Sequence, residues 1–108
     1  MSRILESGEM YLENILVLRG QMEHVRAIDV VKSTGYSKPS ISRALGLLKE
    51  DGMIEVDAQG YITLTPKGEA RAQNVYLRHK TLTAFFMSIG IDEETASADA
   101  CKIEHVIS

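Results

Sequence analysis

Apolar residues recur at helical spacing near the start of the chain, and this pattern predicts a helix from about Ile4 to Arg19. Gly20 ends that helix. Its apolar face comprises Ile4, Leu5, Tyr11, Leu12, Ile15, Leu16 and Leu18.

Two further helices and a hairpin are expected next. A short helix spans about 27–34, Gly35 makes a turn, and SKPSISRALGLLKEDG predicts a third helix with Ser37 as its N-cap and Pro39 in its first turn. Gly52 closes the third helix. The segment MIEVDAQGYITLT then contains two β-rich runs around a turn at 57–60, which indicates a hairpin.

The rest of the chain is expected to be helical. Thr65 caps and Pro66 opens a helix that reaches about Ile89, with Ala72, Val75, Leu82, Phe85 and Phe86 among its apolar positions. A last helix begins near Asp92. The order of helix, short helix, turn, helix and two-stranded β wing predicts a mainly α fold of the winged helix-turn-helix class.

Composition is that of one small globular unit: 108 residues, 44% hydrophobic and 25% charged. No apolar run approaches the ~20 residues that cross a bilayer, and the start lacks a secretory segment. We therefore expect a cytoplasmic protein with no membrane partner. The single cysteine argues against an intramolecular disulfide.

Charge is divided unevenly along the chain, although the net value is only −3. Residues 19–50 hold six Lys/Arg and three Asp/Glu, whereas residues 92–108 hold five Asp/Glu and one Lys. Basic residues thus lie where phosphates would bind and acidic residues where a cation would bind.

The outer face of the third helix is the candidate DNA surface. Arg43 can donate two hydrogen bonds to guanine O6 and N7, Pro39 can touch a thymine methyl, and the serines and Lys38 can contact bases or phosphates. The candidates are Ser37, Lys38, Pro39, Ser40, Ser42 and Arg43. The alternative is a polar face in a protein-binding winged helix, but the basic bias favours double-stranded operator DNA.

A metal site is indicated near the end of the chain. Cys101, Glu104 and His105 lie at i, i+3 and i+4 in ADACKIEHVIS, so on a helix a thiolate, a carboxylate and an imidazole would share one face. Sulfur with oxygen and nitrogen is an unusual set for catalytic zinc and suits a ferrous ion in a reversible sensor.

Three further donors lie upstream. Met10 and Glu13 share a face of the first helix, and His79 lies in the middle of the long helix. Each donor alone has an ordinary alternative role. Met10 could pack in the core, Glu13 could lie on a solvated helix face, His79 could be a surface histidine, and Cys101 could be a small buried apolar residue. The metal prediction therefore depends on their combination.

With these residues in view, the chain resembles the iron-dependent repressor family. The resemblance lies in EMYLENILVL, SKPSISRALGLLKEDGMIEV, ITLTPKGEARA and ACKIEHVIS. It implies that metal joins the N-terminal helix to the helices behind the wing, and that a metal-bound homodimer represses metal-homeostasis genes.

The resemblance also implies a ligand set. Met10, Cys101, Glu104 and His105 match the principal ligand positions of the family's iron branch, whereas the manganese branch has carboxylates in place of Met10 and Cys101. This match favours Fe(II), with Co(II), Ni(II) or Zn(II) as surrogates and Mn(II) as the alternative.

Other positions depart from the iron branch. His79 matches a further ligand of both branches, but the acid and imidazole that accompany it in the iron branch fall on Thr83 and Ser97, which are poor ligands. Glu13 matches a ligand of the manganese branch. A hybrid site that uses Glu13 and His79 therefore stays open.

Two regions are expected: a winged helix-turn-helix DNA-binding domain at 1–65, and a helical metal-binding and dimerisation region at 66–108. The family continues past this point with further helices, so we expect the second region to be incomplete at its C-terminal end.

The expected function is repression without catalysis and without a small organic substrate. Alternatives are a Mn(II)-responsive regulator of the same family and a metal-independent winged-helix regulator in which Cys101 is oxidised. An enzyme would need an open metal position and a general base in a pocket, and the sequence shows no established hydrolase or oxidoreductase motif.

Overall fold

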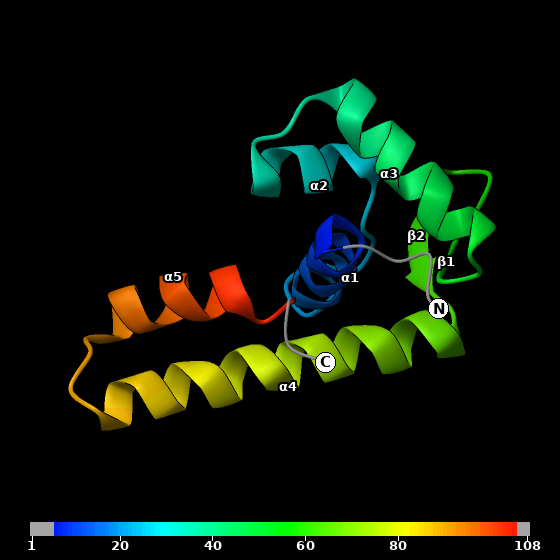
Figure 1. Ribbon diagram of the computed structural model, residues 1–108. Coiled ribbons are helices and arrows are strands. Elements are labelled where there is room, and N and C mark those ends of the chain that lie inside the picture. Colours follow the sequence, from blue (N-terminus) through cyan, green and yellow to red (C-terminus); the bar gives the residue numbers. More distant parts are fainter. Residues whose placement is uncertain (1–5, 106–108) are drawn as a thin grey trace.

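The computed structural model describes residues 6–105 (Figure 1). Its elements are α1 (Glu6–Arg19), α2 (Ala27–Thr34), α3 (Lys38–Glu50), β1 (Ile54–Val56), β2 (Ile62–Leu64), α4 (Pro66–Ser88) and α5 (Glu93–Ile103). This order confirms the mainly α, winged helix-turn-helix prediction. Ile4 and Leu5, which were expected on the first helix, lie outside the described residues.

Local capping chemistry sets the helix starts. The Ser37 hydroxyl accepts a hydrogen bond from the Ser40 backbone N–H at 3.3 Å, and Thr65 does the same for Gly68 at 3.1 Å. Both predicted caps are therefore confirmed. Gly35 between α2 and α3 has a φ of 78°, a left-handed conformation that glycine adopts without strain, so it can make the tight turn of the motif.

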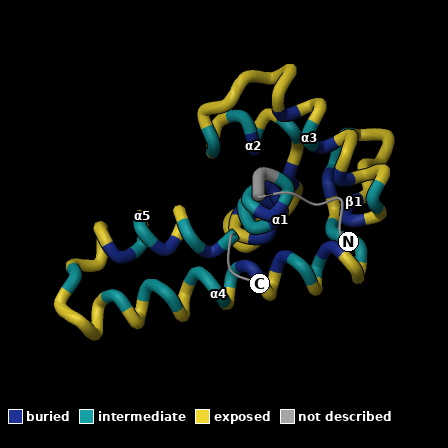
Figure 2. The backbone as a smooth tube through the Cα atoms, in the orientation of Figure 1, coloured by how far each residue is buried: buried dark blue, intermediate teal, exposed yellow. Residues whose placement is uncertain are grey.

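Helix α1 lies between the helix-turn-helix and α4 (Figure 1). Its Leu12 and Ile15 are almost completely buried, together with Val30 of α2 and Ile41 and Leu48 of α3. The tube in Figure 2 accordingly shows dark blue stretches on α1 and on the parts of its neighbours that form the core. Helix α1 thus packs against α2 and α3 of the helix-turn-helix and also against α4.

The wing also fixes where α4 begins. Strands β1 and β2 pair antiparallel with Ile54 opposite Leu64, and Val25 adds one bridge to Ile62. A Cβ atom on Gly68 would lie 1.8 Å from the Met53 carbonyl oxygen. The first turn of α4 therefore packs directly on the backbone before β1, where no side chain fits.

Helices α4 and α5 form an antiparallel hairpin whose tip points away from α1 (Figure 1). Ala96 and Ala100 are fully buried on α5, and these small side chains allow it to lie close to α4. Phe85 of α4, by contrast, is 57% exposed near the tip. In the described part of the chain no helix is long and apolar enough to cross a membrane.

One boundary differs from the sequence prediction. The last helix was expected to carry Glu104 and His105, but α5 ends at Ile103 and both residues lie in the turn that follows. The Glu104 N–H still bonds to the Ala100 carbonyl at 2.9 Å, whereas the Glu104 carbonyl accepts a hydrogen bond from the Arg78 side chain. The Arg78 guanidinium thus contacts the backbone at the first residue after α5.

Candidate metal centre

A pocket of about 340 Å³ lies where α1, α4 and α5 converge. Its lining includes Met10 and Glu13 from α1, His79 from α4 and Cys101 from α5. Residues from three elements thus face one space, although Met10 and Cys101 are 91 positions apart in sequence. The structure brings together four of the six donors that the sequence suggested.

Within the described residues Glu13, His79 and Glu104 form a group whose candidate ligand atoms all lie within 4.8 Å of one another. The Nδ1 atom of His79 lies 2.6 Å from Oε2 of Glu104. Its Nε2 atom lies 3.3 Å from the Ser97 hydroxyl. Ser97, expected to be a poor ligand, thus contacts the ring of a candidate ligand.

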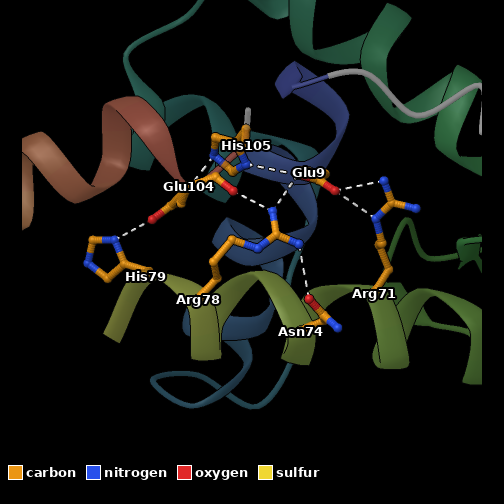
Figure 3. Close-up of polar contacts among 7 residues, drawn as sticks. All are labelled: Glu9, Arg71, Asn74, Arg78, His79, Glu104 and His105. Atoms are coloured by element: carbon orange, nitrogen blue, oxygen red, sulfur yellow. Dashed lines mark hydrogen bonds and ion pairs between the residues drawn. The ribbon is translucent and has the colours of Figure 1, made fainter. Parts of the chain in front are cut away.

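The other carboxylate oxygen of Glu104 faces His105 (Figure 3). Oε1 of Glu104 lies 3.2 Å from Nε2 of His105, and the side chains are only 0% and 7% exposed. Both atoms are buried, and neither has a hydrogen-bond partner in the described part of the chain. The two atoms lie within ion-pair distance of each other, and that contact is attractive only when a proton lies between them; a cation would satisfy both.

The electrostatics of the pocket favour the uptake of a positive charge. Burial raises the pKa of Glu104. Burial and a hydrogen bond with Glu104 raise the pKa of Glu13 to about 7. These carboxyls hold protons more tightly than solvated ones, and a divalent cation would replace the protons on binding.

Cys101 is less enclosed than the other donors. The residue is exposed, yet it lines the pocket beside Met10 and Glu13. Loss of water around the sulfur, followed by the charges of Glu104 and Glu13, raises the pKa of the Cys101 thiol. The thiol is therefore less nucleophilic than an ordinary exposed cysteine, although a cation in the pocket would favour the thiolate.

A buried acid that the sequence analysis missed lies beside this centre. Glu9 of α1 is 5% exposed, and its Oε1 atom lies 3.1 Å from Nδ1 of His105. Its Oε2 atom accepts a hydrogen bond from Nε of Arg71 at 2.7 Å. One signal was available: Glu9 stands four positions before Glu13 and thus on the same face of the helix.

The candidate DNA residues form an exposed strip at the start of α3. All six, namely Ser37, Lys38, Pro39, Ser40, Ser42 and Arg43, are exposed. Ile41, Leu45 and Leu48 turn inward as expected, and Ala44 is half-buried. The Ser37 hydroxyl also donates to the Ser40 hydroxyl at 3.0 Å, so part of its hydrogen-bonding capacity is used within the helix cap.

Comparison with known proteins adds a family context. Residues 65–108 match the family model described as the iron dependent repressor, metal binding and dimerisation domain. The chain is 31% identical over 102 residues to the HTH-type transcriptional regulator MntR of Lysinibacillus sphaericus, covering 94% of this chain and 73% of that protein. It is 28% identical over 109 residues to the iron-dependent repressor IdeR of Mycobacterium tuberculosis, covering 100% of this chain.

Solved structures share the fold. One is a manganese-dependent transcriptional repressor in complex with manganese, with a TM-score of 0.84 at 24% identity over 94% of this chain. The chain spans about half of that structure and of the mycobacterial repressor, 47% in each case.

Proposed function

Because this chain belongs to the iron-dependent repressor family of metal-dependent transcriptional regulators, we propose that it is an Fe(II)-activated repressor of metal-homeostasis genes. Like its relatives it is a regulator and not an enzyme. The observation that carries the proposal is the buried contact of Glu104 Oε1 with His105 Nε2, two atoms without a hydrogen-bond partner within the described residues, beside the group of Glu13, His79 and Glu104.

Six side chains would hold the metal. Met10 and Cys101 offer sulfur, His79 and His105 nitrogen, and the two glutamates oxygen; the set is Met10, Glu13, His79, Cys101, Glu104 and His105. Glu104 directs one oxygen toward His79 and the other toward His105. One Glu104 carboxylate could therefore bind metal together with His79, with His105, or with both. The bound cation would supply a positive charge beside the carboxylates of Glu13 and Glu104.

Fe(II) is favoured over Mn(II) because two of the six donors are sulfur atoms, which bind manganese poorly. The second candidate is a Mn(II)-responsive regulator, and the group of Glu13, His79 and Glu104 supports it. That group contains no sulfur, and carboxylate with imidazole suits Mn(II). A thiol-sensing regulator is less well supported, since the raised pKa of Cys101 lowers its thiolate fraction.

Metal would act by joining the two regions that we assign to 1–65 and 66–108. Met10 and Glu13 lie on α1, which packs against α2 and α3, while the remaining donors lie on or after α4. Metal binds well only when α1 and the α4–α5 hairpin hold one relative position. A preference of a few kcal/mol for that arrangement would shift the population and fix the reading helices for DNA.

Repression would require a homodimer, and we assign its interface to the tip of the α4–α5 hairpin. Phe85 and Ile89 are 57% and 61% exposed there, and Met87 is 43% exposed. Exposed apolar groups of this kind commonly mark an interface. Two reading helices set by a dimer would meet operator half-sites about one DNA turn apart.

Operator binding across a metal series tests the proposal. Randomised duplex DNA is selected with Fe(II)-loaded protein in reducing, anaerobic buffer, and the affinity for the selected site is then measured with Fe(II), Co(II), Mn(II) or a chelator. We expect Fe(II) and Co(II) to tighten binding by ~10–100-fold over the chelator. Equal binding in the chelator would remove metal from the mechanism, and activation by Mn(II) alone would favour the second candidate.

A further inference from the structure

Glu9 is a buried carboxylate outside the proposed ligand set, and it joins three segments of the chain (Figure 3). It lies on α1. Its partners are Arg71 on α4 at 2.7 Å, Arg78 on α4 at 3.6 Å and His105 after α5 at 3.1 Å. Burial of a charged group requires such compensation, and here two guanidinium groups provide it.

Arg78 extends this group to the end of α5. One of its nitrogens donates to the Glu104 backbone carbonyl, and the other donates to Oδ1 of Asn74 at 3.0 Å. The guanidinium is therefore held on both sides, by α4 itself and by the turn after α5. Glu9 and Arg78 together fix the backbone and the ring of the two residues that carry the unpartnered atoms, Glu104 and His105.

The contact with Glu9 also distinguishes the two nitrogens of His105. Nδ1 faces the Glu9 carboxylate, whereas Nε2 faces Oε1 of Glu104. A carboxylate that accepts the Nδ1–H of a histidine leaves the Nε2 lone pair free and holds the ring in place, as at many metal-binding histidines.

We infer that Glu9 is a positioning residue of the metal centre, which orients His105 so that Nε2 is its metal donor. This inference rests on the proposed function, since it assigns Glu9 a role toward the metal. Glu9 itself would not bind the ion: its oxygens are directed to Arg71, Arg78 and His105.

A second ion pair between the same two helices provides a matched control. Arg19 at the end of α1 donates two hydrogen bonds to Glu69 in the first turn of α4, at 2.8 and 2.9 Å. This pair joins α1 to α4 as Glu9 and Arg71 do, but it involves none of the candidate ligands. Loss of Glu69 therefore reports the cost of weakening the α1–α4 contact alone.

The test compares Glu9→Ala, Glu9→Gln and Glu69→Ala by Co(II) affinity, measured against a competing chelator, and by the melting temperature of the metal-free protein. We expect Glu9→Ala to weaken Co(II) binding by about 10–100-fold. Glu9→Gln keeps an oxygen that accepts the Nδ1–H, so its affinity should return close to the wild-type value. Glu69→Ala should lower the melting temperature without changing Co(II) affinity.

Other outcomes would overturn the inference. Glu9→Ala with wild-type affinity would make Glu9 purely structural, and Glu9→Gln as weak as Glu9→Ala would assign its effect to charge and not to orientation. Failure of wild-type protein to bind Co(II) would overturn the proposed function as well.

A measurement on the wild-type protein needs no variant to fold. Zn(II)-loaded protein with ¹⁵N-labelled histidine is examined by long-range ¹H–¹⁵N correlation, which identifies the metal-bound nitrogen of each ring. We expect Nε2 of His105 to bind zinc and Nδ1 to carry the proton. Zinc on Nδ1 would contradict the orientation that Glu9 is inferred to impose.

Discussion

Oε1 of Glu104 and Nε2 of His105 lie 3.2 Å apart, buried and without a hydrogen-bond partner within the described residues. The two residues are adjacent in sequence and directly follow Ile103, the last residue of α5. A buried polar atom without a partner costs about 1–3 kcal/mol, so this arrangement is unfavourable unless a proton or a cation completes it.

Glu104→Gln tests that relationship. The amide keeps the shape of the side chain but removes its charge and weakens the 2.6 Å contact with His79, so the metal-free protein should lose about 1–3 kcal/mol in free energy of unfolding. Its metal-induced rise in melting temperature should largely disappear. Thermal melts with and without Co(II) measure both. Asp99→Asn is the control, since Asp99 lies on α5 and pairs with Lys102 at 4.0 Å; a rise retained by Glu104→Gln would exclude Glu104 as a ligand.

The pH dependence of stability follows from Glu13. Its pKa of about 7 in the folded protein exceeds the ordinary value of 4.5, so between these values the folded state holds a proton that the unfolded chain has released. This contribution to the stability of the metal-free protein is full below about pH 4.5 and is lost as pH rises through about 7. Metal displaces the same proton, so metal affinity should rise over that range.

Comparison of wild type with Glu13→Gln isolates this contribution. Melting temperatures of the metal-free proteins are measured at about pH 5.5 and about pH 7.5. Wild type should lose more stability than Glu13→Gln as pH rises. Parallel behaviour of the two proteins would show that Glu13 titrates as an ordinary solvated carboxyl.

The sequence was sufficient for the fold because its signals are local. Ser37 and Thr65 cap their helices through hydrogen bonds to residues three positions on, and Gly35 occupies the left-handed turn that it predicts. The group around Glu9 could not be predicted in this way. Its hydrogen bond to Arg71 spans 62 positions and that to His105 spans 96, so it depends on how α1, α4 and α5 pack.

The prediction that the last helix carries Glu104 and His105 was wrong for a related reason. The i, i+3, i+4 spacing of Cys101, Glu104 and His105 is helical, but α5 ends at Ile103. Arg78, 26 positions before Glu104, donates to the Glu104 backbone carbonyl, a contact that depends on how α4 and α5 pack and not on local spacing. The two predicted ligands also differ in their surroundings: Glu104 is buried, whereas Cys101 is exposed.

Two glycine substitutions should have opposite effects on stability. Gly68→Ala places a Cβ atom 1.8 Å from the Met53 carbonyl, so α4 must shift away from the wing, and we expect a loss of about 1–3 kcal/mol. Gly46→Ala in α3 meets no atom within 4 Å and should gain about 0.5–1 kcal/mol from helix propensity. Urea unfolding of both proteins measures this; equal stability would contradict the close contact at Gly68.

Arg43→Ala tests the reading helix. Arg43 is exposed on α3, and loss of a two-hydrogen-bond contact with a guanine should cost about 1–3 kcal/mol at one operator position and relax the preference there. Lys38→Ala should weaken binding to all DNA sequences by the same factor, as loss of a phosphate contact does. Selection from randomised DNA distinguishes the two. An unchanged preference for Arg43→Ala would reduce Arg43 to a phosphate contact.

Met10 tests the link between metal and the reading unit. Its side chain is half-buried, packs against the core and also lines the pocket with Glu13 and Cys101. Met22 packs against the same core as a partly buried residue and is not part of that lining. Met10→Ala and Met22→Ala should therefore lower the stability of the metal-free protein by similar amounts, roughly 1–3 kcal/mol, since neither side chain is fully buried. Only Met10→Ala should also reduce the Co(II)-induced rise in melting temperature, because it removes a sulfur ligand. Equal rises in the two variants would limit Met10 to packing, and α1 would then reach the metal through Glu13 alone.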